Sequence, residues 1–137
     1  PYTTLFRSLA WAGYLSDWDG PVEGERPTGY ILILRDLSIQ KNQTVDEGIV
    51  AQTIFLGARD MGYGGCMLMN IKRTELMEIF GLDPEKYAIS MVIALAVPVE
   101  EVKMVEVKDD DIKYYRDENQ VHYVPKRSLK DVIVKEL

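Results

Sequence analysis

The pattern of apolar positions predicts a layered domain in which strands and helices alternate. Residues 30–34 and 87–97 are almost wholly apolar, and each suits a strand buried in the middle of a sheet. Between them, residues 63–69 form a glycine-rich entry to a short apolar strand. The order strand, helix, strand, helix, strand predicts an α/β, or layered α+β, fold with a central sheet flanked by helices.

The clearest helix is predicted over residues 44–62. Thr44 stands three residues before Glu47, which is the spacing of a capping box, and Gly62 is a natural C-cap. Apolar residues recur at helical spacing between these ends and form a wide face. We therefore expect this helix to lie between the sheet and a second surface, such as a partner subunit.

The other segments predict shorter elements. We expect a helical stretch at residues 9–15 and a second helix that is capped by Asn70, faces Leu76, Met77 and Phe80 inward and ends at Gly81. Towards the C-terminus we expect a charged connection at residues 99–111, an irregular hairpin of residues 112–116 and 121–124, a helical turn capped by Ser128 and a strand-like tail at residues 132–134.

Composition and charge remove several classes of function. The net charge is −6, from 16 Lys and Arg against 22 Asp and Glu, and an acidic surface repels the phosphates of nucleic acids. Cys66 is the single cysteine and His122 the single histidine, so a four-ligand zinc site of His and Cys cannot form. No apolar run reaches the ~18 residues that span a bilayer. We expect a reduced, cytoplasmic protein that binds neither nucleic acid nor membrane.

The first eight residues, PYTTLFRS, have an unusual match. The reading CCC TAC ACG ACG CTC TTC CGA TCT encodes them, and that DNA is the end of a widely used short-read sequencing adapter. We therefore expect residues 1–8 to be a non-native artefact and residues 9–137 to be a truncated domain. On this hypothesis the native sequence begins near Leu9, and the absence of a motif from the chain is no evidence against a function.

Two stretches could bind an anionic or planar ligand through main-chain or cationic donors. Gly62, Gly64 and Gly65 link a helix to a strand, where glycine lets backbone amides approach a ligand closely. The alternative is a helix cap followed by a tight turn. Lys126 and Arg127 precede a helix start, where two cations could hold a phosphate. The alternative there is a solvated basic pair.

Three aromatic residues, Trp11, Tyr14 and Trp18, lie close together in a loop-rich stretch. They could line a pocket for a flat substrate, or they could pack against the sheet. Cys66 is expected to be a small core residue because no basic neighbour in the sequence would activate its thiol. His122 is expected to be a hairpin side chain and not a catalyst.

The order and spacing of several segments together resemble the FMN-dependent nitroreductases, from Leu9 to Leu137. The segments that carry the resemblance are the helix that begins Asp46-x-Gly48-Ile49-Val50-Ala51-Gln52, the turn Gly62-Tyr63-Gly64-Gly65-Cys66, Leu76–Leu82, Ile89–Pro98, the basic motif Pro125–Ile133, and Trp11–Leu15 with Asp17–Pro21. The resemblance implies a nitroreductase-like fold, an intertwined homodimer and hydride transfer from NAD(P)H through FMN. Nitroaromatics, quinones and flavins are the implied acceptors, and the order of reaction is ping-pong.

The same resemblance implies which residues would hold the cofactor. Backbone amides at Leu68 and Met69, with Gly65 nearby, match those that reach the N5 and O4 edge of the flavin. Lys126 and Arg127 match the basic residues that hold its phosphate. No catalytic acid, nucleophile or metal is implied, because the cofactor carries the redox chemistry.

The chain also departs from the family pattern. Family members begin with an Arg-x-Ser-x-Arg element and a helix with Ser or Asn that also grip FMN, and both are missing here. We therefore expect a C-terminal fragment in which the N-terminal part of the fold is absent. Two other functions remain open. One is a flavin- or nucleotide-binding or regulatory relative without turnover, and the other is an interaction domain without a cofactor.

Overall fold

The structure, a computed structural model, describes residues 2–135 and the side chains of residues 5–135. It divides into two compact units. The larger unit combines the chain up to Trp11 with Gly20–Pro98, and the smaller unit combines Ala12–Asp19 with the chain from Val99 onward. Each unit is described by itself.

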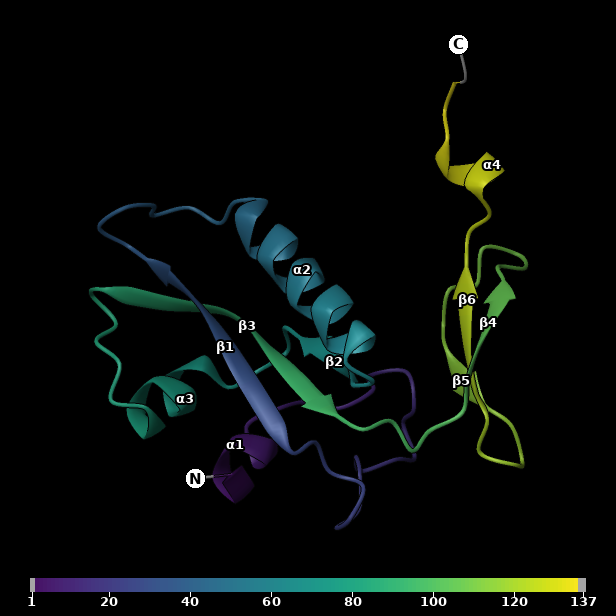
Figure 1. The fold of residues 1–137 in the computed structure, drawn as a ribbon, viewed down its shortest axis with the longest axis horizontal. Helices are drawn as coiled ribbons and strands as arrows, with labels where there is room; N and C mark the ends of the chain where they lie inside the picture. Colours follow the sequence, from purple (N-terminus) through teal and green to yellow (C-terminus); the bar gives the residue numbers. More distant parts are fainter. Residues whose placement is uncertain (1, 136–137) are drawn as a thin grey trace. The chain divides into compact units, whose positions relative to one another are not determined.

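Strands and helices alternate along the chain, as the apolar pattern predicts. The larger unit contains α1 (Tyr2–Arg7), β1 (Gly29–Asp36), α2 (Asp46–Asp60), β2 (Gly64–Leu68), α3 (Arg73–Ile79) and β3 (Tyr87–Ala96) (Figure 1). The smaller unit contains β4 (Val102–Glu106), β5 (Tyr115–Arg116), β6 (His122–Lys126) and α4 (Leu129–Val132). The predicted mixed fold of sheets flanked by helices is confirmed.

The sheet of the larger unit has the order β1-β3-β2, and β3 is antiparallel to both neighbours. Residues 89–94 of β3 are all buried, because strands flank both edges and helices cover both faces. We expected residues 30–34 to form a strand buried in the middle of the sheet, and this is wrong. They belong to β1, an edge strand in which Ile31 and Leu34 are each 37% exposed.

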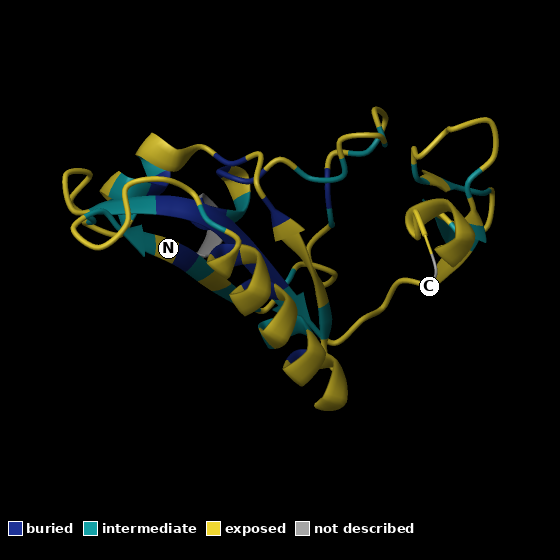
Figure 2. Ribbon diagram, turned by 90° about the horizontal axis from the view of Figure 1, so that it is seen from above, coloured by how far each residue is buried: buried dark blue, intermediate teal, exposed yellow. Residues whose placement is uncertain are grey.

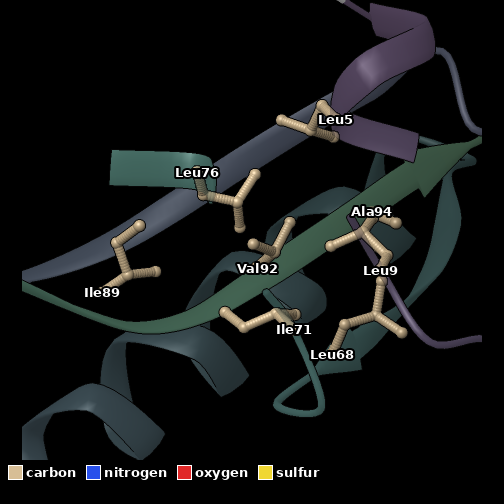
Figure 3. Packing of buried hydrophobic residues seen from close by; sticks show 8 residues of the cluster. All are labelled: Leu5, Leu9, Leu68, Ile71, Leu76, Ile89, Val92 and Ala94. Carbon is tan, nitrogen blue, oxygen red and sulfur yellow. The ribbon is translucent and has the colours of Figure 1, made fainter. Parts of the chain in front are cut away.

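Alternation along β3 divides the apolar core of the larger unit between two faces of the sheet. One face packs against α1 and α3, and its cluster is Leu5, Leu9, Leu68, Ile71, Leu76, Ile89, Val92 and Ala94 (Figure 3). The other face packs against α2, where Ala51 meets Ile33, Met91 and Ile93. Leu76 is completely buried, as predicted, whereas Phe80 is 42% exposed at the end of α3.

The helix α2 begins two residues later than predicted, at Asp46 with Val45 as its N-cap, and it ends before Gly62 as the sequence predicts. The Glu47 carboxylate reaches back to the amide of Thr44 at 2.9 Å, which is the acidic half of a capping box. At the other end Gly62 adopts φ +84°, and the amide of Tyr63 donates to the carbonyl of Ala58 at 2.9 Å. This is the Schellman ending that favours glycine.

The outward side of α2 stays exposed (Figure 2). Ile49, Val50, Leu56 and Met61 are between 48% and 73% exposed. The helix therefore uses only part of its wide apolar face against the sheet, and the remainder is apolar surface of the larger unit.

Two expectations before β3 are wrong. Residues 9–15 form no helix, because Leu9 pairs as an isolated bridge with Ile71. The same pairing draws Asn70 away from a capping role, since its carbonyl accepts a hydrogen bond from the amide of residue 10 at 3.0 Å. The helix α3 consequently begins later, at Arg73.

The smaller unit holds a second three-stranded sheet, with the order β4-β6-β5. The expected connection at residues 99–111 contains β4, because β6 offers it a parallel partner. The expected hairpin is confirmed in shorter form, since β5 pairs antiparallel with β6. Ser128 caps α4 through a reciprocal box with Asp131, as predicted. The strand-like tail at residues 132–134 is wrong, because Val132 ends α4 and no strand follows it within the described residues.

Candidate functional site

The strand β2 lies at one edge of the larger sheet, next to β3. Its pairing with β3 ends at Leu68 opposite Val92, and Met69 follows directly. On its other side β2 has no strand partner among the described residues. An edge strand presents main-chain N–H and C=O groups that its sheet leaves unpaired. The Leu68 side chain is buried in the core (Figure 3) and Met69 is half exposed, so the core anchors the end of this strand.

Gly65 allows β2 to approach β3 closely. A Cβ added at Gly65 would lie 1.8 Å from the carbonyl oxygen of Ala94, and one at Gly64 would lie 2.7 Å from Cγ of Pro98. Close packing thus explains why glycine stands at positions 64 and 65, and the positive φ of Gly62 at the helix end explains the third glycine. The cap and tight turn that stood as the alternative for this stretch are confirmed.

Arg73 holds the chain where β2 ends, a role that no sequence motif indicates. Its Nε donates to the carbonyl of Ile89 at 3.0 Å. Its Nη2 donates to the carbonyl of Met69 at 3.1 Å and to that of Ser90 at 3.2 Å. One guanidinium therefore ties the residue after β2 to the beginning of β3. Only the tertiary structure reveals this role, because the accepting groups belong to the main chain.

A second polar cluster lies at the beginning of α2. The carboxylate of Glu47 accepts hydrogen bonds from Nη1 of Arg35 at 3.2 Å and from the hydroxyl of Ser90 at 3.3 Å. The amide and hydroxyl of Thr44 each donate to the same carboxylate at 2.9 Å. The pKa of Glu47 falls to about 2, chiefly through its own backbone amide and further through Thr44 and Arg35.

A shallow depression of about 260 Å³ opens beside this cluster. Its walls include Arg35, Asp36, Thr44 and Glu47. None of the five predicted flavin-binding residues lines it. Because its polar groups are largely engaged with one another, the cluster stabilises the fold and is distinct from the β2 edge.

Lys126 and Arg127 lie at the end of β6 in the smaller unit, and both are exposed. The guanidinium of Arg127 is 3.0 Å from the carboxylate of Asp110. Lys126 forms no ion pair among the described residues. Asp131 occupies the beginning of α4, where its carboxylate accepts from the Ser128 hydroxyl at 2.8 Å. A phosphate bound by Lys126 and Arg127 would have to replace Asp110 as the partner of Arg127.

The three predicted substrate-pocket aromatics do not share one unit. Trp11 belongs to the larger unit, and its indole packs over Gly20. Tyr14 and Trp18 belong to the smaller unit. The ring of Tyr14 lies 4.9 Å from that of Tyr114, and the guanidinium of Arg116 lies 4.4 Å from the ring centre of Trp18. Each aromatic thus makes a packing contact inside its own unit.

The lone histidine and cysteine also have defined surroundings. His122 lies on β6, where its Nδ1 is 2.9 Å from the carboxylate of Glu100 and its ring meets Tyr114 edge-on. Cys66 is exposed on β2, so its expected place in the core is wrong; the side chain that enters the core from this strand is Leu68. Across residues 2–135, no group of three His, Cys, Asp or Glu side chains is arranged to hold a metal ion.

The donor types present fit a flavin mononucleotide. The edge of β2 offers main-chain amides beside apolar side chains, as the mixed polar and apolar rim of a flavin ring requires. Lys126 and Arg127 offer exposed cations suited to a phosphate. Among the described residues, Asp110 is the acidic side chain that forms an ion pair with Arg127 and would compete with a phosphate.

Comparison with known protein families matches residues 24–97 to the nitroreductase family. This stretch covers more than half of the chain and contains β1, α2, β2, α3 and β3. A comparison with curated proteins gives no match. Within the described part of the chain, no helix is long and apolar enough to cross a membrane. The matched stretch includes the β2 edge and the α2 helix described above, and the chain therefore belongs to the nitroreductase family, a family of flavin-dependent oxidoreductases.

Proposed function

We propose that this protein is an FMN-dependent NAD(P)H oxidoreductase of nitroreductase type. The observation that carries the proposal is the family match over the segment that builds the β2 edge. When bound, FMN would take a hydride from NAD(P)H and pass it to a nitroaromatic, quinone or flavin acceptor in ping-pong order.

The chain's own residues would bind and orient the cofactor. Main-chain amides at Leu68 and Met69 would donate to the polar edge of the ring, and Gly65 would keep β2 close enough to β3 for that edge to be rigid. Lys126 and Arg127 would bind the phosphate. No side chain of this set needs to transfer a proton, which agrees with a chain that has one His and one Cys.

Two further assignments follow from the proposed activity. Trp11, Tyr14 and Trp18 are proposed as side chains that contact the acceptor, since flat acceptors stack well on aromatic rings. The protein would act as a homodimer in the cytoplasm, where NAD(P)H is available. The exposed apolar side of α2 supports the homodimer, because surface of this kind commonly marks an interface.

The test is anaerobic reduction of the flavin-loaded protein. The chain is incubated with FMN, freed of unbound flavin and mixed with NADH or NADPH while the visible flavin band is followed. Bleaching of the band, reversed by a quinone or nitroaromatic, is the expected result. A bound flavin that neither nucleotide reduces would contradict an oxidoreductase and favour a non-catalytic flavin-binding relative. A chain that binds no FMN would favour an interaction domain.

A further inference from the structure

Arg73 has an unusual set of partners for an arginine near the surface. Its guanidinium donates to three main-chain carbonyls, those of Met69, Ile89 and Ser90, at 3.0–3.2 Å. No carboxylate among the described residues pairs with it. Its positive charge is therefore directed at peptide groups and is not neutralised by a neighbouring acid.

The position of these carbonyls explains what Arg73 does. Pairing between β2 and β3 stops at Leu68 opposite Val92, so the β2 side of β3 is uncovered at Ile89 and Ser90. The pairing of β3 with β1 also skips Ser90, where the register shifts by a β-bulge. The guanidinium takes the place that a longer β2 would have filled, and it fixes the carbonyl of Met69 as it does so.

We propose that Arg73 is a positioning residue for the flavin ring, a role that rests on the proposed function. It sets the orientation of the peptide group between Met69 and Asn70, directly after β2. The hydrogen bond from Arg73 to the Met69 carbonyl, at 3.1 Å, holds the peptide group that directly follows the Met69 amide proposed as a flavin donor. The charge of Arg73 near the ring edge favours the reduced, electron-rich state of a flavin.

The experiment compares the full chain with Arg73→Gln, Arg73→Lys and a matched control, Arg59→Gln. Arg59 is an exposed arginine in the last turn of α2, and it forms no ion pair among the described residues. Three quantities are measured: hydrogen exchange of the amides at residues 69–71 without flavin, the Kd for FMN, and the midpoint potential of bound FMN.

We expect Arg73→Gln to exchange faster at residues 69–71, to bind FMN about 10-fold more weakly and to shift the potential of bound FMN to more negative values. Arg73→Lys should recover part of the potential, because it keeps the charge. It should not recover the slow exchange, because one ammonium cannot reproduce the planar fork that reaches three carbonyls. A purely structural role would leave the potential unchanged in every variant.

The outcomes separate this role from the proposed function. If the parent chain binds FMN while Arg73→Gln has the Kd and potential of Arg59→Gln, the role of Arg73 is overturned and the proposed function stands. If the parent chain binds no FMN, both are overturned. Should Arg73→Gln fail to fold, unchanged exchange and unchanged FMN affinity in Arg73→Lys would overturn the role.

Discussion

The hydroxyl of Ser90, the bulged residue of β3, donates a hydrogen bond to the carboxylate of Glu47 at 3.3 Å. Both residues are buried, and the same carboxylate binds Arg35. The carbonyl of Ser90 in turn accepts from Arg73. One bulge residue thus connects the beginning of α2 to the end of β2, the edge proposed to bind the flavin.

Glu47 should make the stability of the protein depend on pH in the acidic range. Its pKa in the folded state is about 2, against 4.5 for an ordinary Glu. A lowered folded pKa contributes stability that is complete above the unfolded pKa and is lost as the pH falls through the folded one. We expect the free energy of unfolding to drop between about pH 4.5 and about pH 2, and Glu47→Gln to flatten this part of the profile.

Urea unfolding at a series of pH values measures this effect. Asp46→Asn is the matched control, because Asp46 is the neighbouring acid of the same helix turn and its side chain is exposed. An acid profile that Glu47→Gln and Asp46→Asn change to the same extent would show that Glu47 has no special part in it.

Two glycines should respond in opposite directions to the same substitution. Gly65→Ala should destabilise the fold by about 1–3 kcal/mol, because its Cβ would lie 1.8 Å from the main-chain oxygen of Ala94, which cannot move aside freely. Gly57→Ala should stabilise by about 0.5–1 kcal/mol, since this glycine lies within α2 and an added Cβ meets nothing within 4 Å. Thermal unfolding of both variants tests the pair, and equal Tm changes would contradict the close approach of β2 to β3.

The proposed homodimer predicts that a charge on the exposed side of α2 weakens self-association. Leu56 is 64% exposed on α2, and Leu56→Lys should move the protein towards monomer at a given concentration without loss of stability. Sedimentation velocity over a range of concentrations measures the shift. Ile39→Lys, in the loop before α2 and 84% exposed, is the control. A parent chain that is monomeric throughout would refute the dimer.

Local signals in the sequence predicted where helices and strands occur better than they predicted which strands pair with one another. The Gly62 cap, the Ser128 box and the hydrogen bond from the Thr44 amide to Glu47 are contacts within a few residues of each other. All three form, although Val45 and not Thr44 is the N-cap of α2. The central position of β3 was not predictable in this way. The apolar runs at residues 30–34 and 87–97 look alike, and only tertiary pairing decides which strand has two neighbours.

The same distinction applies to the candidate site. Gly65, Leu68 and Met69 could be placed on or directly after one strand because that strand follows a recognisable turn. The role of Arg73 could not be predicted. Two of its partners are main-chain carbonyls 16 and 17 residues away, and every residue type has such a carbonyl. The strand β4 was missed because its charged and apolar residues alternate without a strong local signal, and its pairing is with β6, about 20 residues away.

Asp110 provides a sharp test of the proposed phosphate site. Its carboxylate lies 3.0 Å from the Arg127 guanidinium, so it competes with a phosphate for the same donor. We expect Arg127→Ala to weaken FMN binding by about 10-fold to 100-fold, the range for loss of charge-assisted hydrogen bonds. Asp110→Asn should do the opposite and tighten FMN binding, because it frees Arg127. Lys113→Ala removes an exposed cation from the same unit and should leave the Kd close to that of the parent. Quenching of flavin fluorescence at two salt concentrations measures all four proteins. An FMN affinity that is equal in Arg127→Ala and Lys113→Ala would remove Arg127 from the site, whatever Asp110→Asn does.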